Sequence, residues 1–327
     1  MRWFSIIFLF LFVTVSGNAQ LHWQNVDADF QPLPEGVHIY YSNDSLAGKP
    51  NIAYYLSAEL KHTNYNFSAQ IGSGKRYTPS QYYLQEKLPL LVVNTSFFDF
   101  RENRNLNVII KQGKMLAYNQ QCIVGKGRDS LTYIHLFGSA IGINKNREAD
   151  IAWLYTDSNS RFPLASQNAI PIVKDSIARY TKKHLSKSSQ FKKWKMQTAV
   201  GGGPVLVQHG KVQLSNNEEL KFVGKAIYDL HPRTAMGYTA NNKLIVLVVE
   251  GRNPKRAEGA DLLQLGKILL DIGCVEAINL DGGGSSCMLI NGKETIKPSD
   301  KEGQRPIPAV FMIQTISSPK QVQKLLK

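Results

Sequence analysis

The sequence predicts an α+β fold, in which a mostly antiparallel or mixed β-sheet core carries a few inserted helices. Most apolar runs are short, and several meet at a turn-forming pair such as Asn241-Asn242 or Asn291-Gly292, which is typical of β-hairpins. Apolar residues recur at clear helical spacing in only one stretch, residues 259–272. Strands therefore dominate, and we expect a sheet-rich domain.

The predicted elements follow in order along the chain. The apolar run 88–93 is a buried strand that ends at Asn94, and residues 133–146 are expected to form a strand pair. Residues 170–195 show a helical tendency, and the helix at 259–272 has Gly273 where a C-cap belongs. A buried strand at 275–280 and a closing strand at 307–314 complete the set. Hairpins are predicted to turn at Gln112-Gly113, His209-Gly210, Asn241-Asn242 and Asn291-Gly292.

The first 19 residues have the composition of a signal peptide, with one Arg, an unbroken apolar stretch and small residues ending at Ala19. The apolar stretch is too short for a comfortable membrane span, so we expect an exported protein, periplasmic or extracellular, without stable membrane insertion after cleavage. An uncleaved anchor helix is the alternative. The rest divides into an N-terminal segment, 20–87, packed on the main domain, and that domain, 88–327.

The formal net charge of +14 favours anionic partners. Much of it lies in residues 174–195, which either dock a polyanion or form a solvated face. The chain has no zinc-finger, helix-turn-helix or RNA-binding signature, so no nucleic acid partner is expected. The three cysteines, Cys122, Cys274 and Cys287, fit no metal-site spacing. A Cys274–Cys287 disulfide is open, but buried thiols are favoured.

Several apolar strands end in polar residues, which is a common way to build a site. Asn94 and Asp281 each end a strand, Glu250 and Arg252 follow a third, and His231 and Arg233 open a fourth. Each has a plain structural alternative. Glu250 could be salt-bridged to Arg252, Arg233 could form a surface ion pair, and Asp281 could make an Asx-turn.

Three glycines, Gly282 to Gly284, follow Asp281 and precede Ser285 and Ser286. One glycine would suffice for a turn. Three let a ligand approach the backbone closely, and their N–H groups can form an anion-binding nest. The run does not match the Ser elbow or the EF-hand loop, and the other glycine run, which begins at Gly201, lacks the Lys of a P-loop. Two carboxylates, two arginines, a histidine and this nest suit a substrate that carries both a phosphate and a sugar.

The segments "HPRTAMGYT", "EGRNP" and "NLDGGGSSCMLINGK", in that order, resemble the phosphodiester glycosidase family. "VGGGPVLVQHGK" and "KPSDKEGQRPIPAVFMIQ" fit it too, so the resemblance covers residues 88–315. It implies hydrolysis of a sugar-1-phosphodiester, such as a phosphorylated glycan, to free sugar and phosphomonoester by a catalytic domain at 88–327. Thr95 and Ser96 stand where the family has two glycines, which bears on the sugar that fits. Glu250 replaces the family's shorter Asp.

The resemblance implies a set of site residues. The catalytic ones are Asp281, Glu250, His231 and Arg233. The substrate-binding ones are Arg252, Asn94, Phe97, Phe98, Gly202, Asn279, Gly282, Gly283, Gly284, Ser285 and Ser286.

We assign Arg233 and Arg252 to the phosphate, helped by the glycine amides, and His231 to protonate it or hydrogen-bond to it. Asp281 and Glu250 act on the sugar side, one as base or nucleophile and the other as orienter. No cofactor is required by these assignments, and a divalent cation is left open. The alternatives are a phosphodiesterase that attacks phosphorus and a non-catalytic binder of phosphorylated glycans.

Overall fold

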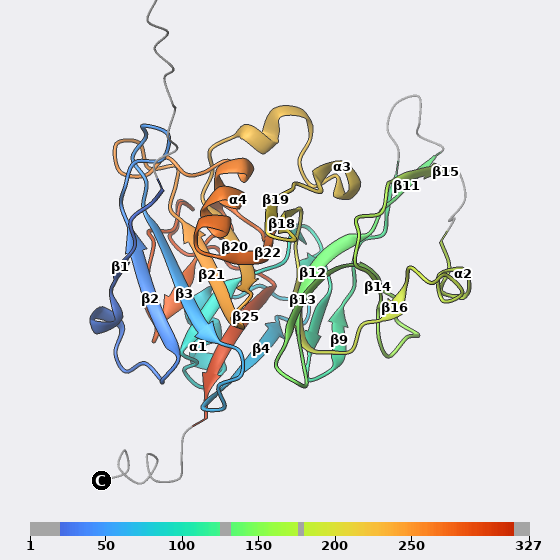
Figure 1. Ribbon diagram of the computed structural model, residues 1–327, viewed down its shortest axis with the longest axis horizontal. Coiled ribbons are helices and arrows are strands. Elements are labelled where there is room, and N and C mark those ends of the chain that lie inside the picture. Colours follow the sequence, from blue (N-terminus) through green and yellow to red (C-terminus); the bar gives the residue numbers. More distant parts are fainter. Residues whose placement is uncertain (1–19, 125–131, 176–179, 317–327) are drawn as a thin grey trace, which may run out of the picture.

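The computed structural model describes residues 20–124, 132–175 and 180–316 (Figure 1). The predicted signal peptide and part of the basic stretch lie outside these residues. The fold is β-dominated, and every strand pair in the described part is antiparallel, so the mixed alternative is wrong. Within those ranges no helix is long and apolar enough to cross a membrane.

The largest sheet has eight strands. Its order is β1 (Gln24–Asn25), β2 (Val37–Ser42), β3 (Ala53–Glu59), β21 (Lys243–Val249), β20 (Arg233–Thr239), β22 (Cys274–Asn279), β18 (Val205–Gln208) and β19 (Lys211–Val212). Its strands β20 and β22 carry the candidate site residues Arg233 and Asn279.

Two further sheets complete the body of the molecule. The seven-stranded sheet runs β16 (Lys192–Lys193), β14 (Leu164–Ser166), β13 (Ala149–Tyr155), β12 (Gly138–Asn144), β17 (Met196–Gly201), β8 (Ile109–Lys111) and β9 (Lys114–Ala117). The five-stranded sheet runs β24 (Lys293–Glu294), β23 (Met288–Ile290), β5 (Leu91–Asn94), β25 (Ala309–Thr315) and β4 (Tyr65–Ile71).

The smaller elements lie around these sheets. A three-stranded sheet of β10 (Cys122–Val124), β11 (Tyr133–His135) and β15 (Val173–Asp175) projects from one side (Figure 1), and β6 (Phe98–Asp99) pairs with β7 (Arg104–Asn105). The helices are α1 (Pro79–Gln85), α2 (Lys182–Leu185), α3 (Asn216–Glu219) and α4 (Leu262–Asp271), with 3-10 turns η1 (Asp27–Phe30), η3 (Gly224–Tyr228) and η4 (Gly283–Ser285).

One apolar core joins the three large sheets. Leu56 of β3, Trp153 of β13 and Phe311 of β25 belong to the same buried cluster. Helix α4 covers the other face of the eight-stranded sheet and buries Leu262, Leu265 and Leu269 in the cluster that it shares with β18 and β22. Its first turn is closed by a capping box between Asp261 and Gln264, which satisfies N–H groups that would otherwise have no partner.

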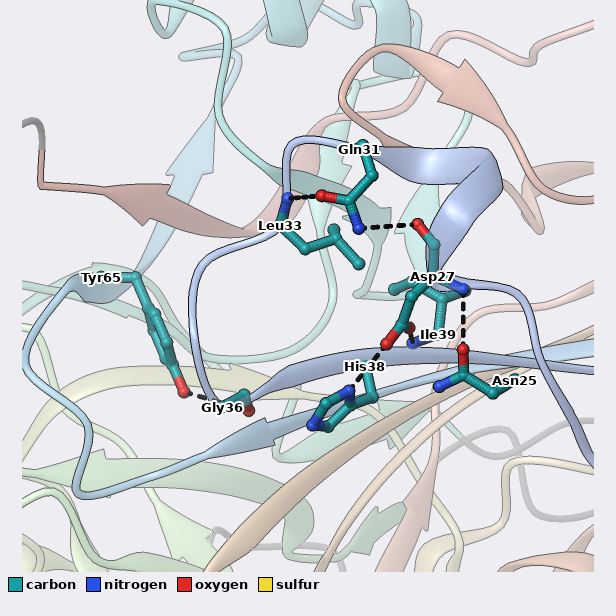
Figure 2. A network of polar contacts seen from close by, with 8 residues as sticks. All are labelled: Asn25, Asp27, Gln31, Leu33, Gly36, His38, Ile39 and Tyr65. Atoms are coloured by element: carbon teal, nitrogen blue, oxygen red, sulfur yellow. Dashed lines mark hydrogen bonds and ion pairs between the residues drawn. The ribbon is translucent and has the colours of Figure 1, made fainter. Parts of the chain in front are cut away.

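The N-terminal segment contributes strands to two of the large sheets. Strand β3 pairs with β21 over seven positions, and β4 pairs with β25 over another seven. Figure 2 shows how its first turn is fastened: the Asp27 carboxylate accepts hydrogen bonds from His38 Nδ1 at 2.8 Å and from the Ile39 amide at 2.7 Å. These bonds hold η1 against β2.

The predicted hairpins are confirmed, since β8–β9, β18–β19, β20–β21 and β23–β24 all form around the expected turns. The strands ending at Asn94 and Asn279 and the closing strand β25 are confirmed as well, and α4 begins three residues later than expected. Cys274 and Cys287 are buried free thiols, whereas Cys122 is an exposed one.

Two other predictions are wrong. The strands β11 and β12 in residues 133–146 do not pair with each other, because each finds its partners in a different sheet. In the described part of 170–195, β15 and β16 flank a helix of only four residues, Lys182–Leu185.

Candidate active site

The end of β22 is bonded to the ends of two neighbouring strands. The Asp281 amide donates to Thr95 O at 2.7 Å, and the Leu280 amide donates to Thr234 O at 2.8 Å. The Gly283 amide donates to Pro232 O, also at 2.8 Å. The structure therefore brings the predicted segments at Asn94, His231 and Asp281 together.

Asn94 locks this junction. It is almost fully buried, and its Oδ1 accepts from Thr234 Oγ1 at 2.8 Å and from the Cys287 amide at 3.1 Å. Its Nδ2 donates to Asp281 O at 2.6 Å, while Thr234 Oγ1 also reaches Ser286 Oγ at 3.2 Å. Because these bonds engage both polar atoms of its amide, Asn94 holds the backbone of Asp281 in place.

Asp281 carries the perturbed carboxyl group of the site. Burial raises the pKa of Asp281 to about 6. A hydrogen bond from the Ser285 hydroxyl and the charge of Arg305 lower this pKa and so offset part of the effect of burial. Asp281 Oδ1 accepts a hydrogen bond from the adjacent Gly282 amide at 3.0 Å. In an Asx-turn the donor would be the amide two residues after the Asp, so this bond does not define an Asx-turn. A carboxyl group that titrates near neutral pH is suited to acid–base or nucleophilic chemistry.

Arg305 is a member of this site to which the sequence assigned no role. Its Nε pairs with Asp300 Oδ2 at 2.6 Å, and its Nη1 donates to Ser285 Oγ at 3.4 Å. The guanidinium also lies 5.5 Å from the ring centroid of Phe100. The only signal for it was its place in a matched segment, because it follows no apolar strand.

The glycine run lies between two guanidinium groups. A Cβ atom on Gly284 would lie 2.2 Å from Arg305 Nη2, and one on Gly283, whose φ is +61°, would lie 3.0 Å from Arg252 Nη2. The bare backbone therefore admits two arginines rather than forming a nest of three free amides. The Gly282 and Gly283 amides already donate to Asp281 and Pro232, which makes the three-amide cradle wrong.

His231 and Arg252 form a pair at the edge of this run. Arg252 Nη2 lies 3.4 Å from His231 Nδ1, and since a guanidinium only donates, Nδ1 is the acceptor. Burial, followed by the charges of Arg233 and Arg252, lowers the pKa of His231. The imidazole is thus neutral near pH 7 and is better fitted to donate a hydrogen bond from Nε2 than to protonate a phosphate.

Arg233 is buried rather than part of a surface ion pair. Its Nε donates to Ala260 O at 2.8 Å, its Nη2 donates to Asp229 O at 2.7 Å, and its guanidinium lies over the ring of Phe222. Burial lowers its pKa to about 10, so it remains charged at neutral pH. It braces two loops and adds positive potential to the site.

Glu250 is fully committed to protein partners. Its side chain is buried and pairs with Arg256 Nε at 2.7 Å, not with Arg252 as the structural alternative supposed. Asn253 Nδ2 and the Lys297 amide also donate to it, at 3.2 and 2.9 Å. These bonds engage both oxygens of the Glu250 carboxylate.

The remaining predicted residues support the site at different depths. Asn279 Nδ2 donates to Gly203 O at 2.8 Å, and Asn107 Nδ2 donates to Gly202 O at 3.1 Å. These two bonds fix the 202–203 backbone beside the end of β22. Phe97 packs edge-on against Phe222. Phe98 belongs to a separate buried cluster and packs against Phe100, with ring centroids 4.5 Å apart.

The phosphodiester glycosidase family model matches residues 89–314. The chain belongs to this family. Among curated family members, the bovine N-acetylglucosamine-1-phosphodiester alpha-N-acetylglucosaminidase (Bos taurus) is 32% identical over 103 residues, which is 29% of this chain and 19% of that protein. The chain thus spans about a fifth of the curated relatives that it matches.

Solved structures share the family fold. The zebrafish N-acetylglucosamine-1-phosphodiester alpha-N-acetylglucosaminidase catalytic domain, auto-inhibited by its pro-peptide, aligns with a TM-score of 0.56 and 18% identity over 91% of this chain and 89% of that one. A Burkholderia pseudomallei protein described as exported aligns with a TM-score of 0.56 and 16% identity over 84% and 75%. At these identities the likeness establishes the fold.

A transition-metal centre has no obvious ligand set here. Within residues 20–124, 132–175 and 180–316, no three or more His, Cys, Asp or Glu side chains gather so that they could hold a metal ion. The carboxylates of this family member's site, Asp281, Glu250 and Asp300, each have their own protein partners.

Removing the charge of Arg305 is expected to raise the pKa of Asp281 further, by about one unit or more, because burial then acts with less opposition. The measurement is a ¹³C NMR titration of the Asp281 carboxyl carbon in the parent and in Arg305→Gln. The exposed Arg101, changed to Gln, is the matched control. An unchanged or lower pKa in Arg305→Gln would contradict the geometry described above.

Proposed function

We propose that the chain is an exported hydrolase that cleaves a sugar-1-phosphodiester, for example an N-acetylglucosamine-1-phospho-glycan, to free sugar and a phosphomonoester. The observation that carries the proposal is the Asp281 carboxyl group, with a pKa of about 6, which feels the charge of Arg305, while the Arg252 guanidinium lies against Gly283. Family membership and the names of the curated relatives point to the same substrate class. The composition of residues 1–19 and the exported structural neighbour support export.

The arrangement supplies what this reaction demands. The bond between the anomeric carbon and the bridging oxygen breaks, and its electron pair leaves with the phosphate. Arg252 and Arg305 stabilise the growing negative charge, and the neutral His231 donates a hydrogen bond to the same group. Since phosphate leaves readily, a strong general acid is less necessary than in an ordinary glycosidase.

Asp281 acts on the sugar side. It either takes the proton of a water that attacks the anomeric carbon or forms the bond to that carbon itself before water releases the sugar. Glu250 keeps the β21 end in place through Arg256 and Lys297, and Asn94 does the same for the Asp281 backbone. In both versions water oxygen ends on the sugar.

Hydrolysis in ¹⁸O-water tests this proposal. We expect the label in the released sugar and none in the phosphomonoester, because the C–O bond is the one that breaks. Label in the phosphate would instead show attack at phosphorus. Binding without turnover across a panel of sugar-1-phosphodiesters, with and without chelator, would identify a non-catalytic binder.

A further inference from the structure

Lys221 is a cationic side chain that the proposed mechanism does not use. It follows α3, where Leu220 adopts a left-handed conformation with a φ of +50°, and it is only partly exposed. Its ammonium lies 5.4 Å from the ring centroid of Phe97. The side chain thus points inward, toward a residue of the candidate active site.

Two backbone segments tie Lys221 to Asp281. A Cβ atom on Gly203 would lie 3.0 Å from Lys221 Cε, and Gly203 O accepts from Asn279, two residues before Asp281. On the other side, Phe97 follows Thr95 by two residues, and Thr95 O accepts from the Asp281 amide. Lys221 therefore stands beside both segments that hold the reacting carboxylate.

The next residue connects Lys221 to the arginines of the site. Phe222 packs edge-on against Phe97, with ring centroids 6.3 Å apart, and presents its face to Arg233 at 5.4 Å. The two consecutive residues thus form one wall, with an ammonium at one end and a guanidinium at the other. Such a wall concentrates positive potential where an anionic substrate would lie.

The ammonium of Lys221 has no ion pair of its own among the described residues, where no carboxylate oxygen lies within 4.0 Å. Glu219 acts on it electrostatically, but the Glu219 oxygens already accept from Ser139, Trp153 and other donors. Burial lowers the pKa of Lys221, and Glu219 partly offsets this. Because Lys221 is partly exposed and has no carboxylate oxygen within ion-pair distance, its ammonium can accept an anionic group of a ligand as a direct partner.

We propose that Lys221 is an anion-binding residue of this site, whose ammonium takes a phosphate or carboxylate oxygen of the substrate on the side that Phe97 does not cover. The inference rests on the proposed function, because it places the anion in the same site. The oxygen belongs either to the scissile phosphate or to a second acidic group on the substrate. Both sources share one chemistry, a charge-assisted hydrogen bond.

Binding of inorganic phosphate tests the inference without any turnover. Lys221→Met keeps the length of the side chain and removes its charge, and Lys225→Met makes the same change at an exposed lysine of η3. By calorimetric titration, we expect Lys221→Met to bind phosphate about 10- to 100-fold more weakly than the parent, and Lys225→Met to bind it as the parent does. Lys221→Arg should recover part of the affinity.

Equal phosphate affinity in the parent and both Met variants, including no measurable binding in any of them, would overturn the inference. Thermal unfolding shows whether each variant is folded, and Lys221→Gln replaces Lys221→Met if the latter is not. Because the titration needs no catalysis, it can succeed even if the protein hydrolyses nothing, so the two proposals fail separately.

Kinetics then separate the two sources of the oxygen. One substrate is a sugar-1-phosphodiester with a neutral aglycone, and the other carries an additional phosphate on the aglycone. A rise of KM in Lys221→Met on both substrates assigns Lys221 to the scissile phosphate. A rise on the second substrate alone assigns it to the additional group, and no rise on either contradicts the inference.

Discussion

Asp281→Asn is expected to lower kcat/KM for sugar-1-phosphodiesters by about 100-fold or more, because the amide can neither accept a proton nor form a bond to the sugar. The side chain keeps its size, and its oxygen can still accept from the Gly282 amide. The measurement is steady-state kinetics on the purified variant. Asp271→Asn, at the exposed end of α4, is the control and should keep the parent rate.

The same substitution should not cost stability at pH 8. The pKa of Asp281 is raised from an ordinary 3.8 to about 6 in the folded protein. Its ionisation therefore lowers the free energy of unfolding as pH rises from about 4 to about 6, and the loss stays in full at higher pH. Replacing the carboxylate by a neutral amide removes this loss. An Asp281→Asn protein that is folded but retains most of its activity would remove Asp281 from the mechanism, and an unfolded one would show that its role is structural.

Glu219→Ala is expected to lower the free energy of unfolding by about 3–5 kcal/mol, the largest stability effect that we predict for a single side chain. Its carboxylate accepts from Ser139 Oγ, Ser215 Oγ and Trp153 Nε1, and also from the Ser139 and Val205 amides. These donors come from three different strands and the start of α3, and all of them lose their acceptor together. Chemical denaturation measures the change.

Glu218→Ala is the neighbouring control, because no side-chain hydrogen bond of Glu218 to another described residue is found, and it should change stability by less than about 0.5 kcal/mol. A loss below about 1 kcal/mol in Glu219→Ala would mean that the donors find water instead. In that event the hydrogen bonds to Glu219 would not be what fixes the position of the backbone around Gly203 and Val205.

The predicted hairpins formed because their turns are local: two residues such as Asn291 and Gly292 decide the geometry whatever lies elsewhere. The prediction that β11 pairs with β12 was wrong because each strand pairs with strands that are distant in the sequence, β11 with β15 and β12 with β17. The helix expected within 170–195 is short for the same reason. Parts of this stretch form β15 and β16, which pair with β11 and β14.

The sequence predicted which strand ends meet at the site. It did not predict which side chains form hydrogen bonds and ion pairs there. The strand ends did bring Asp281, His231 and Arg252 to one place. Glu250, however, took Arg256 as its partner, because the left-handed backbone of Arg252, with a φ of +59°, directs that guanidinium to Gly283. Arg305 and Lys221 make their contacts with Ser285 and Phe97 from loops, and apart from the matched segment that contains Arg305 no local sequence pattern indicates these contacts.

The family match begins at residue 89, yet the strands that flank β21 and β25 come from before it. Without β3 and β4, two seven-residue strand edges would stand open, which is a template for adding a foreign strand. The two sheets that contain the region of family likeness are therefore completed by strands from outside it. In this chain, residues 53–59 and 65–71 shield these two edges.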